Sequence, residues 1–400
     1  MKRPSCFVFA ALGLMAVAAT RAPAVAPAPS PDTQQGTDAE SADVVEKVKN
    51  VKSLHKEDPR VIPVYRSFRV WNGIAISANG RPFVSLPGVE GAGEQLAELD
   101  MHGDPFPWPD RAWNQWKPGS PFGSAFVHVN AARFGPDGTL WVVDAGSPGL
   151  GKPAVPGAAR LFGFDIVTKK PVHLFPLQAA TRPASYIDDV RFNGDHAYLT
   201  DAGAAGLIVL DLKTGAVRRV LDDDPSTVDQ RPLMADGKEL RDETGKPVHV
   251  NADQLEVSPD GRYLYYQPAS GPLSRIETKW LDDPAIAPAD VAKNVEEAWA
   301  NTPTSGGTAI DAKGNIYMGS ANDRSILKIT PDGTISTLTT DPRLIWTDAM
   351  WIDAQGYLWM PAAQLNRVKG FNGAKKSLVE YPVWIYKIRI GIGPPPNDHS

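Results

Sequence analysis

Polar residues recur at one position of a repeated hairpin pattern, and their side chains carry oxygen atoms that could bind a ligand or a metal. The first positions of the six copies are Asn72, Asn130, Asp188, Asp253, Gly306 and Asp348. Hard cations such as Ca²⁺ prefer carboxylate and amide oxygens, whereas Zn²⁺ prefers His and Cys. The pattern therefore predicts a divalent cation site, with Ca²⁺ as the expected metal, formed by Asn72, Asn130, Asp188, Asp253 and Asp348.

Charge repulsion supports this prediction, although a simpler explanation exists. Three carboxylates held close together would repel one another, so either a bound cation or raised pKa values should result. The alternative is that these positions are polar because they line a wet channel, since Asn and Asp also favour the turns that lead into strands. A wet channel does not by itself require three Asp residues, which favours the ligand site.

His128 and Asp188 are the candidate catalytic residues. His128 lies two residues before Asn130, so the two side chains share one face of a strand. In that place His128 could act as a general base, or it could be a structural hydrogen-bonding group.

Four further residues are candidates for substrate binding. Arg133 and Arg191 occupy the same place in neighbouring copies and could bind an anion, or form ion pairs between repeats. Trp108 and Trp113 belong to a Pro- and Trp-rich segment at 102–125, where they could cover a flat ligand or fill the core of the loop.

The elements that carry these residues are predicted to be β-hairpins. Each copy has an apolar residue at the fifth position, a turn glycine and a second apolar run beyond it, and the copies are 42 to 65 residues apart. The glycine is at the ninth position in five copies and comes earlier in the Asp188 copy, which has a deletion in the turn. A second hairpin often follows, as at 161–175, and two hairpins make a four-stranded sheet. Six such sheets predict an all-β, six-bladed β-propeller, whereas a β-sandwich would have no reason to repeat one polar position six times. Residues 384–390 are expected to close the ring, and 279–300 have a helical pattern.

The chain ends differ in composition from the repeats. Residues 1–22 combine Lys2 and Arg3 with an apolar run of 14 residues, which is typical of a secretory signal peptide. We expect a flexible linker rich in Pro and Ala at 23–60, the propeller at 61–392 and a disordered tail at 393–400. The single cysteine, Cys6, lies in the signal segment, so no disulfide is expected.

Composition limits the partners and the location. The chain has 400 residues, 41 Lys and Arg, 46 Asp and Glu, and a formal net charge of -5, which argues against nucleic acid as a partner. No stretch after the signal segment is apolar enough to span a membrane. We expect a secreted or periplasmic monomer that binds a small molecule.

Several strings resemble the yellow / major royal jelly protein family. They are the hairpin repeat, residues 105–114 (PFPWPDRAWN), residues 140–146 (LWVVDAG) and residues 201–211 (DAGAAGLIVLD). The resemblance covers roughly residues 60–390 and is closest to bacterial, dopachrome-tautomerase-related members. It implies export and a six-bladed propeller. It does not imply one activity, because some members are linked to dopachrome conversion and others bind small amines or serve for storage.

A weaker resemblance is to the gluconolactonase / regucalcin propellers. Residues 347–359 look like their late-blade Asp motif, and residues 253–261 look like their Asn-Gly-Leu motif. That family's ligand set of one Glu, two Asn and one Asp would correspond here to Asn72, Asn130, Asp253 and Asp348.

Three functions remain open at this stage. The first is cation-assisted isomerase chemistry of the tautomerase kind at the central channel. The second is metal-dependent hydrolysis of a lactone. The third is a non-catalytic binding or interaction protein that uses the same pocket or the faces of the ring. Fold alone does not decide among them.

Overall fold

The structure is a computed structural model that describes residues 56–399, all of which belong to one compact unit, Asn50–Ser400. The predicted signal peptide and most of the predicted linker lie outside the described residues. Within 56–399, no helix has the length and apolar character needed to cross a membrane.

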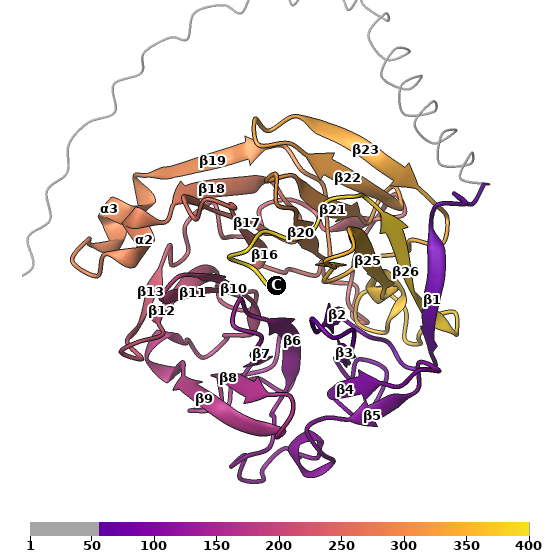
Figure 1. Cartoon of the computed structure of the whole chain (residues 1–400), viewed down its shortest axis with the longest axis horizontal. Coiled ribbons are helices and arrows are strands. Elements are labelled where there is room, and N and C mark those ends of the chain that lie inside the picture. Colours follow the sequence, from indigo (N-terminus) through magenta and orange to yellow (C-terminus); the bar gives the residue numbers. More distant parts are fainter. Residues whose placement is uncertain (1–55, 400) are drawn as a thin grey trace, which may run out of the picture. The chain divides into compact units, whose positions relative to one another are not determined.

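Six four-stranded antiparallel sheets form a ring, which confirms the predicted six-bladed β-propeller (Figure 1). Blade 1 consists of β2 (Gly73–Ile76), β3 (Pro82–Ser85), β4 (Leu96–Leu99) and β5 (Pro105–Pro107). Blade 2 consists of β6 (Val129–Phe134), β7 (Leu140–Asp144), β8 (Arg160–Asp165) and β9 (Lys170–Pro176). Blade 3 consists of β10 (Ile187–Asn193), β11 (His196–Asp201), β12 (Gly206–Asp211) and β13 (Val217–Val220).

The second half of the ring repeats this order. Blade 4 consists of β16 (Ala252–Val257), β17 (Tyr263–Pro268), β18 (Leu273–Glu277) and β19 (Val295–Ala300). Blade 5 consists of β20 (Thr308–Ile310), β21 (Ile316–Ser320), β22 (Ser325–Ile329) and β23 (Ile335–Thr340). Blade 6 consists of β24 (Trp351–Ile352), β25 (Tyr357–Ala362), β26 (Val383–Arg389) and β1 (Ile62–Ser67). The small hairpin between blades 3 and 4 consists of β14 (Met234–Ala235) and β15 (Lys238–Glu239).

Blade 6 joins the two ends of the propeller. Strand β1 pairs antiparallel with β26, which itself pairs with β25, so an N-terminal strand completes a C-terminal sheet. The late strand predicted at 384–390 is therefore confirmed as β26. Because the first strands of neighbouring blades contact one another around the ring, they form its inner wall, and their ends define the two mouths of the channel.

The predicted turn glycines occupy the hairpins after the inner strands. All six have positive φ, between 57° and 83°, a conformation that residues other than Gly rarely adopt. They are Gly80, Gly138, Gly194, Gly261, Gly314 and Gly356. The repeat was recognisable because this local backbone requirement recurs in every blade.

Two segments differ from the sequence-based expectation. The pattern at 279–300 gives only two short helices, α2 (Lys279–Asp282) and α3 (Pro288–Ala292), and then strand β19. Pairing of β19 with β18 provides more backbone hydrogen bonds to blade 4 than a surface helix would. The tail at 393–399 is not disordered, because Asp398 and His399 are buried and the C-terminal end lies at the centre of the ring (Figure 1).

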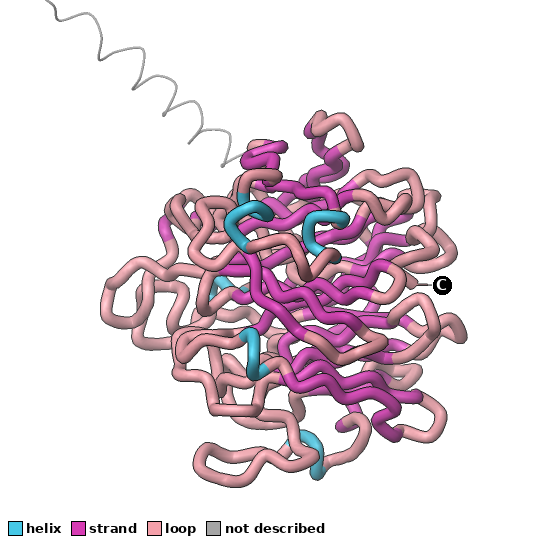
Figure 2. The backbone as a smooth tube through the Cα atoms, turned by 90° about the vertical axis from the view of Figure 1, so that its left-hand side faces the viewer, coloured by secondary structure: helices cyan, strands magenta, loops and turns pink. Residues whose placement is uncertain are grey.

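The side view separates the two mouths of the channel. The strands cross the middle of the molecule, long loops extend on one side, and the C-terminal end lies on the other (Figure 2).

Candidate functional site

The five predicted polar residues line one cavity at the first ends of the inner strands. Asn72 and Asp348 lie just before β2 and β24, and the other three lie within the first half of β6, β10 and β16. The cavity has a volume of about 600 Å³, and its wall includes Asn72, Asn130, Asp188, Asp253 and Asp348. The repeat register therefore identified positions that the fold brings together, although the residues lie as far as 276 positions apart.

Asn130 connects the polar groups of blades 1, 2 and 3. Its Nδ2 donates to Oδ1 of Asp188 at 2.6 Å, and its Oδ1 accepts from the hydroxyl of Tyr186 at 2.8 Å. The amide of Asn72 donates to the backbone carbonyl of Asn130 at 3.3 Å. These bonds fix the orientation of the Asp188 carboxylate, which points toward the space shared with Asp253.

Asp253 and Asp348 are held by hydrogen bonds within or beside their own blades. Oδ2 of Asp253 accepts from Nε2 of Gln254 at 2.8 Å. Oδ2 of Asp348 accepts from the indole Nε1 of Trp346 at 3.0 Å, and Oδ1 accepts from the backbone N–H of Ala349 at 2.9 Å. The carboxylates are thus fixed in position without a basic side chain paired to any of them among the described residues.

Burial raises the pKa of all three carboxyl groups, and repulsion from neighbouring carboxylates adds to the rise. Burial raises the pKa of Asp188 to about 7, although hydrogen bonds from Asp253 and Asn130 oppose that rise. Burial, followed by the charge of Asp188, raises the pKa of Asp253 well above its usual range. Burial and the charge of Asp188 also raise the pKa of Asp348. Because Asp188 and Asp253 interact directly, the two carboxyl groups titrate as a pair that shares a proton.

The first position of the blade 5 copy is a glycine, Gly306, for a steric reason. A Cβ atom on Gly306 would lie 2.5 Å from Nε1 of Trp346 and 3.0 Å from Oδ2 of Asp348. The absent side chain leaves room for the hydrogen bond between these two residues. Gly306 therefore belongs to the site even though it has no functional group.

His128 lines the cavity but is poorly suited to be a base at neutral pH. Burial lowers the pKa of its imidazole to about 4, so the ring is neutral at pH 7. Its Nε2 is buried without a hydrogen-bond partner in the described part of the chain, and its ring lies 5.4 Å from that of Tyr186. An efficient general base has a pKa near the working pH. His128 is better placed to bond with a ligand than to take a proton.

Trp108 and Trp113 do not reach the cavity, which corrects the prediction that they cover a ligand. Trp108 is 1% exposed and packs edge-to-face on Phe83 and Phe164. Trp113 packs on Phe126, with ring centroids 5.0 Å apart, and also on Phe164. These rings fill the hydrophobic core between blades 1 and 2, because burying large aromatic surface there stabilises the fold.

Arg133 and Arg191 lie deeper along the inner strands and also do not line the cavity. Arg191 forms a two-pronged ion pair with Glu256 at 2.9 and 2.8 Å and a second pair with Asp189 at 2.6 Å. Since Glu256 belongs to blade 4, the alternative of an ion pair between blades is correct for Arg191. Arg133 instead meets Asp398 from the C-terminal tail at 3.5 Å.

Two aromatic residues of the site were missed. Tyr186 and Trp346 lie two residues before Asp188 and Asp348, just as His128 lies two residues before Asn130. A period of two places Tyr186 and Asp188 on one face of an extended chain, so the even offset that singles out His128 also indicates Tyr186. Trp346 has a left-handed backbone, with φ of 50°, so the strand period does not predict its place.

Loops complete the cavity wall with charged groups of both signs. Asp242 and Glu243 line the mouth, as do Lys152 and Lys369, and Lys369 pairs with Glu243 at 2.9 Å. With the three inner Asp residues, five acidic groups face two lysines. This excess favours a bound cation or a cationic group of a ligand.

The donor set fits a hard cation better than a transition metal. Within 56–399, no three His, Cys, Asp or Glu side chains lie close enough together to hold a metal by themselves. A cation here would need amide or water oxygens besides the carboxylates, and the amide of Asn130 lies beside Asp188, to which its Nδ2 donates. Carboxylate and amide oxygens of this kind suit Ca²⁺, and a cation would offset the repulsion that raises the pKa values.

The fold and the cavity define a class, the six-bladed propellers with a polar cavity at one mouth of the channel. Within this class, the major royal jelly protein family model matches residues 136–388. The chain therefore belongs to the major royal jelly protein family, which confirms the resemblance found in the sequence.

Solved structures support the fold independently. A gluconolactonase from Xanthomonas campestris is 15% identical, with a TM-score of 0.50, over 82% of this chain and 89% of its own. A luciferin-regenerating enzyme is 10% identical, with a TM-score of 0.53, over 84% of this chain and 96% of its own. At these identities the likeness concerns the fold alone. A search of curated proteins gave no match.

Proposed function

We propose that this protein binds a small molecule in the cavity around Asp188, with a divalent cation, Ca²⁺, held by Asn130, Asp188 and Asp253. Asn72 and Asp348 would complete the site directly or through water. One observation carries the proposal: polar side chains from five blades converge on a cavity of about 600 Å³, where the charge of Asp188 adds to the raised pKa of Asp253 and Asp348. When bound, the cation would let these groups ionise together and would polarise an oxygen atom of the ligand.

The chemistry that we propose for this site is isomerisation by proton transfer. A tautomerase must remove a proton from one atom of its substrate and return one to another. Burial raises the pKa of Asp188 to about 7 in the cation-free site, so this group can exchange a proton near neutral pH. A bound cation would keep Asp188 ionised as the base that removes the proton from the substrate. Asp188 is therefore our candidate acid–base group, and His128, neutral and without a partner for Nε2, would orient the ligand by a hydrogen bond.

Two other functions use the same cavity. A lactonase-like hydrolase would need a cation and an activated water, and its reaction would consume water rather than move a proton within one molecule. A binding protein would retain the ligand unchanged. The buried Tyr186 and Trp346 rings favour this last function as the second candidate, because they offer apolar surface to a flat ligand beside the acidic groups.

Thermal unfolding tests the cation site. Chelator treatment should lower the melting temperature and Ca²⁺ should restore it, since a cation at about 100 times its Kd adds roughly 2.7 kcal/mol of stability. Asp253→Asn combined with Asp348→Asn should remove this response and leave the protein folded, because each change keeps the volume and removes a charge.

The matched control is Glu297→Gln, which removes one negative charge from the exposed strand β19. This variant should respond to Ca²⁺ as the unaltered protein does. A melting temperature that ignores chelator, Ca²⁺, Mg²⁺ and Mn²⁺ would contradict the cation site.

Activity assays separate the three functions. Dopachrome and phenylpyruvate, which rearrange by proton transfer, and a simple aldonolactone serve as probes, followed by absorbance and by acid release. Isomerase function predicts conversion of a tautomer probe that Asp188→Asn reduces at least a hundredfold. Acid release from the lactone alone would favour the hydrolase, and calorimetric binding of a tautomer probe without conversion would favour the binding protein.

We also propose export, directed by the N-terminal segment. The mature N-terminus should begin between about residues 19 and 27, and mass spectrometry of the protein from the envelope or medium measures it. Recovery of the chain with intact Met1 in the cytosol would contradict export.

A further inference from the structure

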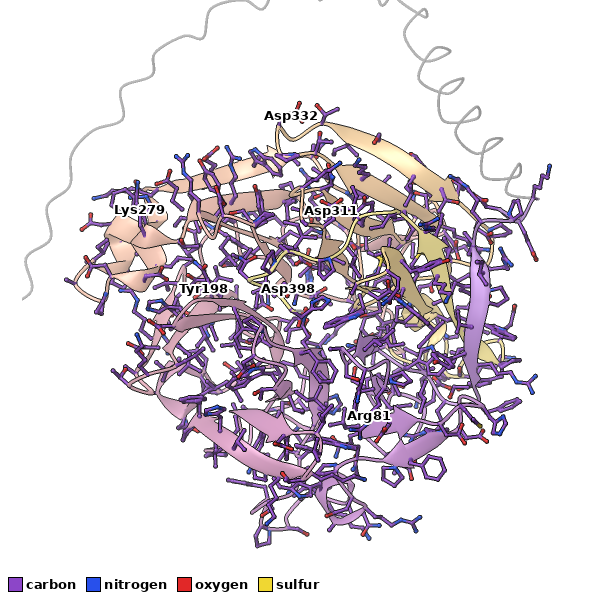
Figure 3. All side chains as sticks on the ribbon, viewed as in Figure 1. Arg81, Tyr198, Lys279, Asp311, Asp332 and Asp398 are labelled. Atoms are coloured by element: carbon purple, nitrogen blue, oxygen red, sulfur yellow. The ribbon has the colours of Figure 1, made fainter. Side chains whose placement is uncertain are left out.

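The C-terminal segment at 393–399 fills the second mouth of the channel. Its hydrogen bonds are made to residues that end or follow the inner strands of blades 4, 5 and 6, namely Ser258, Ala312 and Ile352. Asp398 lies near the centre of the ring (Figure 3). Ile352 comes four residues after Asp348, which lines the acidic cavity, and four residues of extended chain span roughly 13 Å. The segment therefore lies at the opposite end from the cavity.

Arg133 is the charged group that this segment covers. Its side chain is buried, and Asp398, at 3.5 Å, is the only carboxylate paired with it among the described residues. Its Nη1 makes one long bond, 3.5 Å, to the carbonyl of Met350, and its Nε is buried without a partner. Arg133 therefore has donors that the fold leaves almost free, whereas those of Arg191 are taken by Glu256 and Asp189.

An aromatic platform lies beside this guanidinium group. The ring of Trp351 lies 5.3 Å from the Arg133 guanidinium carbon and stacks on the ring of His399, with centroids 3.6 Å apart and planes at 20°. The His399 ring also bonds to the Asp398 carboxylate at 2.9 Å. A carboxylate on a guanidinium, next to a flat ring on an indole, is the arrangement in which a protein holds an aromatic acid.

We propose that Arg133 and Trp351 form a second binding site, for a small planar aromatic carboxylate, which the chain's own Asp398 and His399 occupy in this structure. The tail acts as a tethered ligand. A tethered group competes at an effective concentration in the millimolar range, so a free ligand binds fully only after the tail has left. Release of the tail would also open this end of the channel. The site differs in charge and position from the acidic cavity and does not depend on its function.

The test uses a chain that stops after Ile392, with benzoate as the probe and neutral benzamide as its control. Without the tail, Arg133 loses its counter-ion and Trp351 loses the ring stacked on it, so the melting temperature should fall by about 5 °C. Benzoate should restore it and should bind in calorimetry at least tenfold more tightly than to the full chain. Benzamide should do neither, and Arg133→Gln in the shortened chain should abolish benzoate binding.

A second variant serves if the shortened chain does not fold. The full-length chain with Asp398→Ala and His399→Ala keeps the tail but removes both groups from the site, and it should gain the same benzoate binding. Asp253→Asn, at the other end of the channel, should leave that binding unchanged. Failure of benzoate to bind either variant, equal binding of benzamide, or binding that persists in Arg133→Gln would overturn the proposal.

Discussion

The two ends of the channel are built from the same inner strands but differ in how their charges are paired. At the first ends, Asp188, Asp253 and Asp348 face one another without a basic partner among the described residues, and their pKa values rise. Farther along, Arg191 has two carboxylate partners, and the cations around Asp398 hold the pKa of that carboxyl well below its usual range despite its burial. A matched set of charges stabilises the ring, whereas an unmatched set is maintained at a cost to stability. The unmatched end is therefore the better candidate for function.

Breaking the matched set should have the largest effect on stability. Arg191→Met leaves Glu256 and Asp189 buried without their cation, which should cost about 3–5 kcal/mol in the free energy of unfolding. Urea denaturation measures this loss. The control is Arg182→Gln, which breaks the exposed pair with Asp222 and should cost less than about 1 kcal/mol. Equal, small losses in both variants would show that the buried pair does not stabilise the ring.

The pH dependence of stability should separate the two ends. The folded pKa of Asp188, about 7, exceeds its ordinary value of 3.8, so stability should fall as pH rises from about 4 to 7. Asp188→Asn should remove about 2–4 kcal/mol of that fall. Asp398 has a lowered pKa, so its contribution is present above about pH 4 and is lost at lower pH.

Urea denaturation from pH 3 to pH 8, in the presence of chelator, gives both effects. Asp398→Asn should weaken the protein more at pH 7 than at pH 3, because the contribution of Asp398 declines as pH falls below 3.8 toward its lowered folded pKa. If Asp188→Asn leaves the profile unchanged between pH 4 and 7, the carboxylates of the cavity do not share a proton.

The ring itself could be predicted because its signals are local. Turn glycines such as Gly138 and Gly261 recur in every blade, since each hairpin needs positive φ at that place, and the repeat register then located Asn130 and Asp188 in the cavity. In a propeller, equivalent positions of the repeat lie at the same depth along the channel. Residues that recur periodically in the sequence therefore surround one site.

The remaining errors concern contacts between distant segments. Trp108 looks the same in the sequence whether it covers a ligand or fills the core, and only its packing on Phe164 decides between them. The tail has the composition of a linker, yet Asp398 meets Arg133, which lies 265 positions earlier. Such pairings depend on which surface remains uncovered once the blades have assembled. The periodic pattern of the sequence does not predict which surface that is.

Adding a side chain at Gly306 should distort the acidic cavity at the unmatched end of the channel. Gly306→Ala places a methyl group against Nε1 of Trp346, and overpacking of this kind costs about 1–3 kcal/mol. Ca²⁺ should bind more weakly as Asp348 shifts. Gly149→Ala, where an added Cβ meets nothing within 4 Å, is the control and should change the free energy of unfolding by less than about 1 kcal/mol. Equal stability of the two variants would show that the cavity accommodates a methyl group at position 306.

The smallest expected effect comes from removing one hydrogen bond. Trp346→Phe keeps an aromatic ring but removes the bond from Nε1 to Asp348, which should cost about 1 kcal/mol in urea denaturation. Ca²⁺ affinity should fall by less than tenfold, because Asp348 keeps its bond from the backbone of Ala349. A complete loss of Ca²⁺ binding would show that Trp346 is essential to the geometry of the site.

Anomalous diffraction from crystals soaked in Mn²⁺, which takes oxygen ligands as Ca²⁺ does, would locate a cation in the acidic cavity. We expect one strong peak at the first ends of the inner strands, at about 2.0–2.6 Å from oxygen atoms of Asn130, Asp188 and Asp253. Asp253→Asn with Asp348→Asn should abolish the peak. Crystals without a peak at this place, or with a peak only at surface carboxylates, would contradict the claim that the unmatched acidic end is a cation-dependent functional site.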